Sequence, residues 1–201
     1  MKIIFATGNR HKLSEAQAIL GPEFELVSPK DLGCHEDIPE DGNTFEANAE
    51  QKARYLWDRF GLPCFADDSG LEVDALHGAP GVFSARYAGP QKNDADNLNK
   101  LLDDLREVPV HDAQGRALRT ARFRCSIALI LNEECHVFNG TSEGEITLSA
   151  SGNGGFGYDP IFRPEGYTAN FSELSAEEKN RISHRGRAMR QMADWLQQQT
   201  R

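Results

Sequence analysis

The chain has 201 residues, 39% of them hydrophobic and 26% charged, so one domain can bury a substantial core without a disulfide or a structural metal. Its net charge of -9 opposes binding along a nucleic-acid backbone, which requires an extended positive surface, but it is compatible with a mononucleotide ligand. The cysteines show no C-x-x-C spacing, which argues against a zinc site or a redox pair. The apolar run at the amino terminus is too short for a signal peptide and no later segment could span a bilayer, so no membrane partner and a reducing, cytoplasmic location are expected.

The hydrophobic pattern predicts strands and helices in a mixed order. The expected strands cover residues 2–6, 24–27, 63–66, 71–73, 122–131, 136–140 and 143–148. The expected helices cover residues 12–20, 44–60 and 93–107, followed by a last helical region that opens at a capping box of Ser175 and Glu178. Because strands and helices do not alternate strictly, we expect an α/β protein with a mixed sheet. No repeat or linker divides the chain into independent domains.

The segment Thr7-Gly8-Asn9-Arg10-His11-Lys12 lies between the first expected strand and the first expected helix. A helix amino terminus presents unpaired N–H groups and the positive end of the helix dipole, both of which favour phosphate oxygens. Gly8 would allow the backbone to approach such a ligand, and Lys12 could place its ammonium on a phosphate. The alternative is a turn with surface charges, and the spacing of a Walker A loop is absent.

Two acidic segments, Glu40-Asp41-Gly42 and Asp67-Asp68-Ser69-Gly70, are candidates for a magnesium site. Magnesium prefers a few carboxylates together with water and phosphate oxygens. One carboxylate could also act as a general base toward an attacking water. Neighbouring side chains of an extended chain point to opposite faces, so Asp67 and Asp68 are expected to do different jobs. The alternative for Asp-Asp-Ser-Gly is an ordinary turn.

A glycine-rich segment, Gly154-Gly155-Phe156-Gly157-Tyr158-Asp159-Pro160, could present an aromatic face to a base, and Asp159 could accept hydrogen bonds from a base edge. The alternative is a loop whose aromatic rings are buried in the core. Further along the chain, Lys179, His184 and Arg185 offer donors to the O6 acceptor of a 6-oxo purine, where adenine carries a donor instead. For these residues the alternative is a solvated helix face.

Taken together and in this order, the segments resemble one family. The matching segments are Thr7-Gly8-Asn9-x-x-Lys12, Glu40-x-Gly42-x-Thr44-Phe45-x-x-Asn48-Ala49, Ala66-Asp67-Asp68-Ser69-Gly70-Leu71, Gly78-Ala79-Pro80-Gly81, Ser84-Ala85-Arg86-Tyr87, Phe156-Gly157-Tyr158-Asp159-Pro160 and Ser183-His184-Arg185. They resemble the inosine/xanthosine triphosphate pyrophosphatases, and closely the bacterial dITP/XTP type. The resemblance implies hydrolysis of ITP, dITP, XTP and dXTP to the monophosphate and pyrophosphate, which keeps non-standard purines out of DNA and RNA.

The same resemblance implies an elongated mixed β-sheet with flanking helices, forming two lobes of a single domain around a central nucleotide cleft. It also implies Mg²⁺ as the cofactor and a homodimer. Asp68 would be the catalytic proton acceptor and a metal ligand, with Glu40 as a further metal ligand. The residues expected to contact the substrate are Thr7, Gly8, Asn9, Arg10, His11, Lys12, Ser69, Phe156, Gly157, Tyr158, Asp159, Lys179, His184 and Arg185, with Phe156 stacked on the purine.

Three other functions are compatible with parts of this pattern. A pyrophosphatase acting on thymidine or uridine triphosphates is disfavoured because the Phe156 segment and Ser183-His184-Arg185 suit a large 6-oxo purine. A nucleotide sensor is disfavoured because it would not need the paired acids Asp67 and Asp68 or Glu40. An RNA-binding module is opposed by the net charge. The degree of discrimination against GTP and the preference for ribose or deoxyribose stay open.

Overall fold

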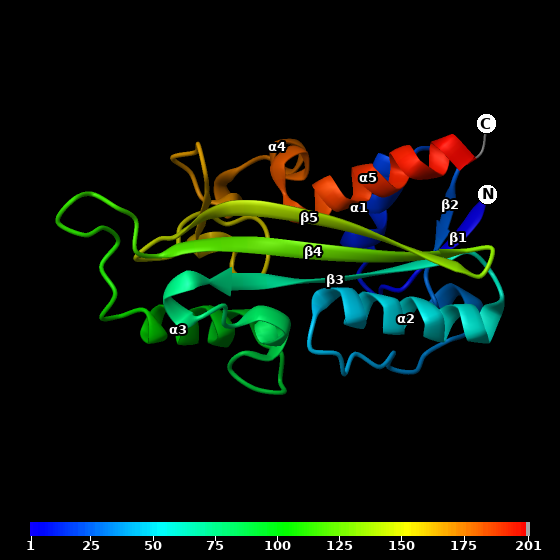
Figure 1. Cartoon of the computed structure of the whole chain (residues 1–201), viewed down its shortest axis with the longest axis horizontal. Helices are drawn as coiled ribbons and strands as arrows, with labels where there is room; N and C mark the ends of the chain where they lie inside the picture. Colours follow the sequence, from blue (N-terminus) through cyan, green and yellow to red (C-terminus); the bar gives the residue numbers. More distant parts are fainter. Residues whose placement is uncertain (200–201) are drawn as a thin grey trace. The chain divides into compact units, whose positions relative to one another are not determined.

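The structure is a computed structural model that describes residues 1–199, except for the side chain of His11. These residues form a six-stranded sheet with the strand order β2-β1-β3-β4-β5-β6. Figure 1 labels the first five strands of the chain, β1 to β5. The strands are β1 (Lys2–Phe5), β2 (Glu25–Val27), β3 (Cys64–Val73), β4 (Thr120–Leu131), β5 (Glu134–Ile146) and β6 (Phe162–Pro164). β1 is parallel to β2 and β3, whereas β5 and β6 are antiparallel. The predicted mixed sheet is therefore confirmed.

The α-helices are α1 (Arg10–Leu20), α2 (Phe45–Phe60), α3 (Asp94–Asp104), α4 (Ala176–Ile182) and α5 (His184–Gln199). Two of the predicted helices begin at side-chain caps: Thr44 accepts a hydrogen bond from the amide of Ala47 at 3.1 Å, and Asn93 accepts one from Asp96 at 2.9 Å. The last helical region is divided in two at Ser183, although the sequence predicts no division there. Within residues 1–199, the helices are too short or too polar to cross a membrane.

Two strand predictions are wrong in the same way. Residues 63–66 and 71–73 were expected as separate strands around a turn, but β3 is continuous and includes Asp67 to Gly70. Residues 136–140 and 143–148 were likewise expected as two strands, but both belong to β5. In both strands, polar side chains such as Asp67 and Ser142 are buried by contacts with other parts of the fold. These tertiary contacts outweigh the tendency of the polar residues to form a turn, and the strand continues.

The chain divides into two compact units. Unit 1 contains Met1–Asp68, Cys125–Gly140 and the chain from His184 onward, and unit 2 contains Ser69–Arg124 and Thr141–Ser183. β3, β4 and β5 each begin in one unit and end in the other, so neither unit is a continuous segment. A nucleotide cleft, which the resemblance implies, remains a prediction.

The core of unit 1 lies on both faces of the sheet, because successive buried side chains of β1 and β3 point to opposite faces. Odd-numbered residues of β1 and β3, such as Phe5 and Phe65, pack with α1 and α5, and the rings of these two phenylalanines stack at 4.4 Å. Even-numbered residues, such as Ile4 and Ala66, pack with α2 on the other face (Figure 1). Successive side chains of a strand point to opposite faces, so two helical layers cover one sheet.

The core of unit 2 is built from α3 and a group of aromatic rings. α3 contributes Leu98 and Leu101, which are buried with strand residues of this unit. Phe162 lies between two other rings, with its centroid 4.7 Å from that of Phe123 and 4.9 Å from that of Phe171. Leu98 and Leu101 belong to the same core as these rings, and their burial there fixes the position of α3 within the unit.

Gly140 of β5 lies where strand and helix backbones meet closely. A Cβ atom at Gly140 would lie 2.0 Å from the carbonyl oxygen of His184 and 2.7 Å from the amide nitrogen of Ala188, both in α5. Because these are backbone atoms of a packed helix, they cannot move aside as the end of a flexible side chain can. The start of α5 therefore depends on a glycine at this position.

We expect Gly140→Ala to destabilise the protein by about 3 kcal/mol, the upper end of the range for overpacking, because α5 must move away from β5. Urea unfolding followed by circular dichroism measures this loss. Gly115→Ala is the matched control, since a Cβ there meets open space and only backbone strain at a φ of 78° is added. An equal or smaller loss for Gly140→Ala than for Gly115→Ala would contradict the proposed steric origin.

Candidate active site

Two neighbouring carboxylates of β3 lie on opposite faces of the sheet. Asp67 continues the alternation of Phe65 and faces the layer of α1 and α5, because its partners come from those helices. Asp68 continues the alternation of Ala66 and bonds instead to a residue of α2. The predicted placement of the two acids on opposite faces is confirmed, their different jobs stay a prediction, and the interpretation of this segment as a turn is wrong.

Asp67 is a buried carboxylate held between cations. Its Oδ2 lies 2.9 Å from Nε of Arg185 and 3.2 Å from Nζ of Lys12, and only 3% of the residue is exposed. Burial by itself would raise the pKa of Asp67, but Lys12, Arg185 and Lys52 outweigh it and hold the pKa well below the usual range. The neighbouring thiol of Cys125 responds in the opposite way, since burial and then the charge of Asp67 raise its pKa to about 12. Asp67 therefore stays ionised and joins β3 to α1 and α5.

Asp68 has a different electrostatic environment. Its Oδ2 accepts a hydrogen bond from Nδ2 of Asn48 at 2.9 Å, and its Oδ1 lies 3.9 Å from Nζ of Lys52. Burial raises the pKa of Asp68, Glu40 and Asp67 raise it further, and Lys52 and Asn48 lower it only in part. A carboxylate with a raised pKa is a better proton acceptor than an ordinary one, which is what a general base requires.

Lys52 brings the second acidic segment to Asp68. Its Nζ lies 3.2 Å from Oε2 of Glu40 and donates to the carbonyl oxygen of Asp67 at 2.9 Å. The side chain of Asn48 contributes too, because its Oδ1 accepts the amide of Gly42 at 2.6 Å. Two residues of α2, one helical turn apart, thus dock the acidic segment beside the end of the unit 1 part of β3.

The donor set fits a magnesium ion. Among the side chains that the structure describes, no group of three or more His, Cys, Asp or Glu residues converges on one point. Magnesium does not need such a group, because it commonly uses one or two carboxylates and completes its shell with water and substrate phosphate oxygens. Glu40 and Asp68 supply two carboxylates that already share one cation, Lys52.

The predicted phosphate segment is a loop that opens α1. Oγ1 of Thr7 accepts the amide of Asn9 at 3.1 Å, and Oδ1 of Asn9 accepts the amide of Lys12 at 3.3 Å. These two bonds shape the turn from β1 into the helix, so α1 begins at Arg10 and not at residue 12 as predicted. Gly8 is exposed beside the helix amino terminus, where an anion is favoured. The side chain of His11, one of the predicted contacts, lies outside the described part of the structure.

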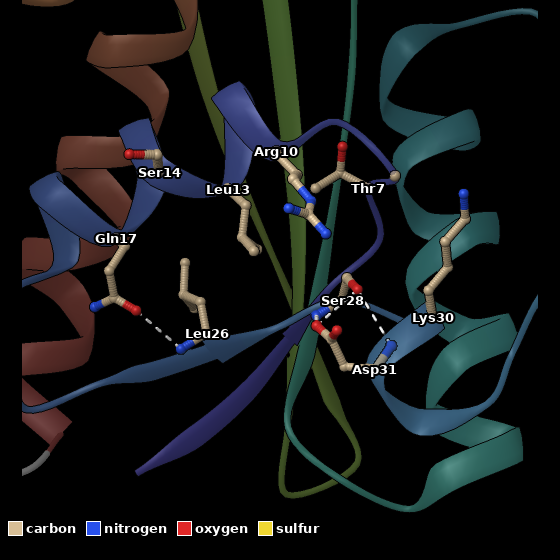
Figure 2. A pocket seen from close by; sticks show the side chains of 10 residues that line it. Thr7, Arg10, Leu13, Ser14, Gln17, Leu26, Ser28, Lys30 and Asp31 are labelled. Carbon is tan, nitrogen blue, oxygen red and sulfur yellow. Dashed lines mark hydrogen bonds between the residues drawn. The ribbon is translucent and has the colours of Figure 1, made fainter.

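A pocket of about 550 Å³ lies next to this loop (Figure 2). Arg10 and Lys30 place two cations in its wall, and a Cβ at Gly8 would lie 3.8 Å from Nζ of Lys30. Asp31 is the acid in the wall, and its Oδ2 accepts the amide and hydroxyl of Ser28, both at 2.8 Å. The residues that line the pocket are Thr7, Gly8, Arg10, Leu13, Ser14, Gln17, Leu26, Ser28, Lys30 and Asp31.

The predicted base-binding residues of unit 2 form a second cluster. Phe156 is 45% exposed, so the interpretation of a ring buried in the core is wrong for this residue. Asp159 is buried, and its Oδ2 accepts the amide of Phe156 at 2.8 Å and lies 2.6 Å from Nζ of Lys179. The same ammonium lies 4.6 Å from the centroid of the Phe156 ring, a cation–π contact. Tyr158 is in the core, with its hydroxyl donating to the carbonyl oxygen of Ser84 at 2.8 Å.

The remaining predicted residues are distributed between the units. Ser69 is half-buried and follows Asp68 in β3, at the start of unit 2. His184 and Arg185 begin α5 in unit 1 and are both buried, so a solvated helix face is the wrong interpretation for them. Arg185 has Asp67 as a partner, and its predicted role in recognising the base stays a prediction.

Several residues of these clusters had no predicted role. Asn48 and Lys52 are polar positions four residues apart beside the apolar stripe of α2, which is a signal for a second functional face on that helix. Lys30 lies in a short 3-10 helix after β2, and no sequence pattern connects it to Gly8. Asp94, which contacts the glycine-rich loop, resembles any acid in the first turn of a helix.

Comparison with known proteins identifies close relatives. Residues 3–195 match the model of the Ham1 family. A protein of Porphyromonas gingivalis named dITP/XTP pyrophosphatase is 51% identical over 195 residues, which cover 97% of each chain. One of the same name from Flavobacterium psychrophilum is 48% identical and covers 98% of this chain and 99% of its own. The solved Ham1 protein of Staphylococcus aureus superposes with a TM-score of 0.89 at 37% identity, covering 99% of this chain and 100% of that one.

The two acids should respond in opposite ways to loss of charge. Ionised Asp67 stabilises the fold, because its pKa lies below that of the unfolded chain, whereas ionised Asp68 costs stability, because its pKa lies above. Asp67→Asn leaves two cations facing a neutral group, and we expect a loss of about 3–5 kcal/mol. Asp68→Asn should be neutral or slightly stabilising.

Urea unfolding of both variants at neutral pH measures these changes. Equal losses for Asp67→Asn and Asp68→Asn would contradict the assignment of the structural role to Asp67 alone.

Proposed function

Because the chain belongs to the Ham1 family, we propose that it hydrolyses non-standard purine nucleoside triphosphates, of the inosine and xanthosine type, to the monophosphate and pyrophosphate. The observation that carries this proposal is the pair of acids in β3. Asp67 is neutralised by Lys12 and Arg185, while Asp68 has a raised pKa and adjoins a second carboxylate through Lys52. A protein that only binds nucleotides has no need of such a pair.

In the proposed reaction, Asp68 accepts a proton from a water that attacks the α-phosphorus. The bond between the α-phosphorus and the bridging oxygen breaks, and pyrophosphate leaves with that oxygen. A magnesium ion held by Glu40 and Asp68 would supply charge neutralisation for the triphosphate and the leaving group. The phosphate oxygens are held by Lys12 and by the backbone of the loop from Thr7 to the start of α1.

The cluster of unit 2 is proposed to recognise the base. Phe156 offers an exposed ring for stacking, which is worth about 1–3 kcal/mol for a base. Lys179 offers a donor beside that ring, and a donor suits the O6 acceptor of inosine and xanthosine. Adenine carries an amino group at the same place, which is also a hydrogen-bond donor. ATP would therefore place this donor against the ammonium of Lys179, and no hydrogen bond could form between them. Asp159 orients Lys179 and holds the loop.

A homodimer and a cytoplasmic location complete the proposal. The homodimer rests on the family resemblance. The location is supported by the cysteines, since Cys34, Cys64, Cys125 and Cys135 are all free thiols.

The proposed function predicts a pattern of substrates. With magnesium present, ITP, dITP and XTP should release pyrophosphate rapidly, while ATP and dTTP should be nearly inert, because the donor set reads O6 of a purine. Excess chelator should stop the release. Turnover of dTTP or UTP in place of ITP would retain the acidic site but contradict the roles of Phe156 and Lys179, and no turnover of any nucleotide would favour a sensor.

Asp68→Asn should lower kcat for ITP by about 10²–10⁴-fold, the usual contribution of a general base, because the amide cannot accept the proton of the attacking water. Steady-state release of pyrophosphate measures this. Asp58→Asn, an exposed change on the surface of α2, is the control and should keep normal turnover. Near-normal kcat in the Asp68→Asn variant would remove Asp68 as the base.

A further inference from the structure

Two carboxylates hold consecutive amides of the glycine-rich loop in unit 2. Asp159 accepts the amide of Phe156 at 2.8 Å, and Oδ2 of Asp94 accepts the amide of Gly157 at 2.9 Å. Asp159 is close in sequence, but Asp94 lies 63 residues before Gly157, in a different part of the fold. The loop is therefore tied to an element outside itself.

Asp94 is placed by the architecture of α3. Asn93 caps this helix, so Asp94 is its first residue and projects from its amino terminus. A carboxylate is favourable there, because it complements the positive end of the helix dipole. The helix itself is fixed by Leu98 and Leu101, which are buried in the core of the unit. The acceptor that Asp94 offers to the loop is thus attached to a rigid support.

The loop needs such support, because its aromatic ring is not held by packing alone. Phe156 is 45% exposed, and its neighbours Gly155 and Gly157 have positive φ angles of 73° and 59°. Glycines in such conformations have wide conformational freedom, so an untethered loop would have to be ordered each time a ligand binds. Anchoring the amides on both sides of the Cα of Phe156, its own and that of Gly157, fixes the direction in which the ring leaves the backbone.

We propose that Asp94 is a positioning residue for base recognition, acting through Gly157 on the orientation of the Phe156 ring. The proposal rests on the proposed function, since the partner of the ring is taken to be the purine of the substrate. Stacking of this kind is made equally in the ground state and the transition state. Loss of Asp94 should therefore raise KM and leave kcat nearly unchanged.

The decisive variants are Asp94→Ala, Asp96→Ala and Asp94→Asn. Asp96 is a matched control, because it lies in the same first turn of α3 and, within the described residues, its carboxylate forms no hydrogen bond or ion pair. Removing either acid has the same effect on charge and on the helix dipole. Asp94→Asn removes the charge but keeps an acceptor oxygen for the amide of Gly157.

Two measurements apply to all the variants: steady-state kinetics with ITP, and amide hydrogen exchange of residues 154–158 in the free protein. For Asp94→Ala we expect KM to rise about three- to tenfold with kcat unchanged, since one loop segment must be ordered on binding. Exchange of the loop amides should become faster in the same variant. Asp96→Ala and Asp94→Asn should behave like the wild type in both measurements.

The inference is overturned if Asp94→Ala exchanges its loop amides at the wild-type rate, or if its KM equals that of Asp96→Ala. It is also overturned if kcat falls while KM stays constant. Failure of the proposed function has a different signature, namely a wild-type protein that does not release pyrophosphate from ITP. The two failures are therefore distinguishable in the same experiment.

Discussion

The proposed catalytic part of unit 1 depends on one buried ion cluster, in which the carboxylate of Asp67 contacts the side chains of Lys12 and Arg185. These residues come from β3, α1 and α5, so the cluster forms only when all three elements are in place. Removing charges from water is costly and is compensated only by close, well-oriented partners. Such a cluster adds little net stability over apolar packing, but it penalises any arrangement in which one partner is missing. It fixes Lys12 next to the loop proposed to bind phosphates.

Successive side chains of β3 point to opposite faces of the sheet, and this places two neighbouring carboxylates in different electrostatic environments. Asp67 and Asp68 are covalent neighbours, yet their pKa values move in opposite directions, because Lys12 and Arg185 outweigh burial at Asp67, whereas burial and the charge of Glu40 prevail at Asp68. The same separation makes a net charge of -9 compatible with the proposed triphosphate substrate. The electrostatic potential that a ligand meets is local, and three cations, Lys12, Arg10 and Lys30, lie around the loop of Thr7 and Gly8.

The sequence predicts the elements whose ends are determined locally and fails where distant partners decide. Thr44 and Asn93 cap their helices through bonds within a few residues, and these helices were predicted closely. Asp67 to Gly70 has the composition of a turn, but the partners of Asp67 and Asp68 come from three helices, and the strand continues. The two acidic segments were singled out from their composition, and the roles predicted for Glu40 and Asp68 came from the family resemblance. Lys52 was missed because its role depends on where α2 packs, and Asp94 was missed because its partner lies far along the chain.

Both clusters use the same physical device. In unit 1 the buried carboxylate of Asp67 holds Lys12, and Asp68 beside it is the acid proposed to react. In unit 2 the buried carboxylate of Asp159 holds Lys179 and the amide of Phe156, and the ring stays exposed for a ligand. A group that must meet a substrate cannot be immobilised by burying it, so its orientation has to come from a neighbour that is buried. The conformational entropy of these groups is then lost during folding, when the carboxylates acquire their partners, and not when the ligand binds. This division explains why the most buried acids of the site are not the ones proposed to react.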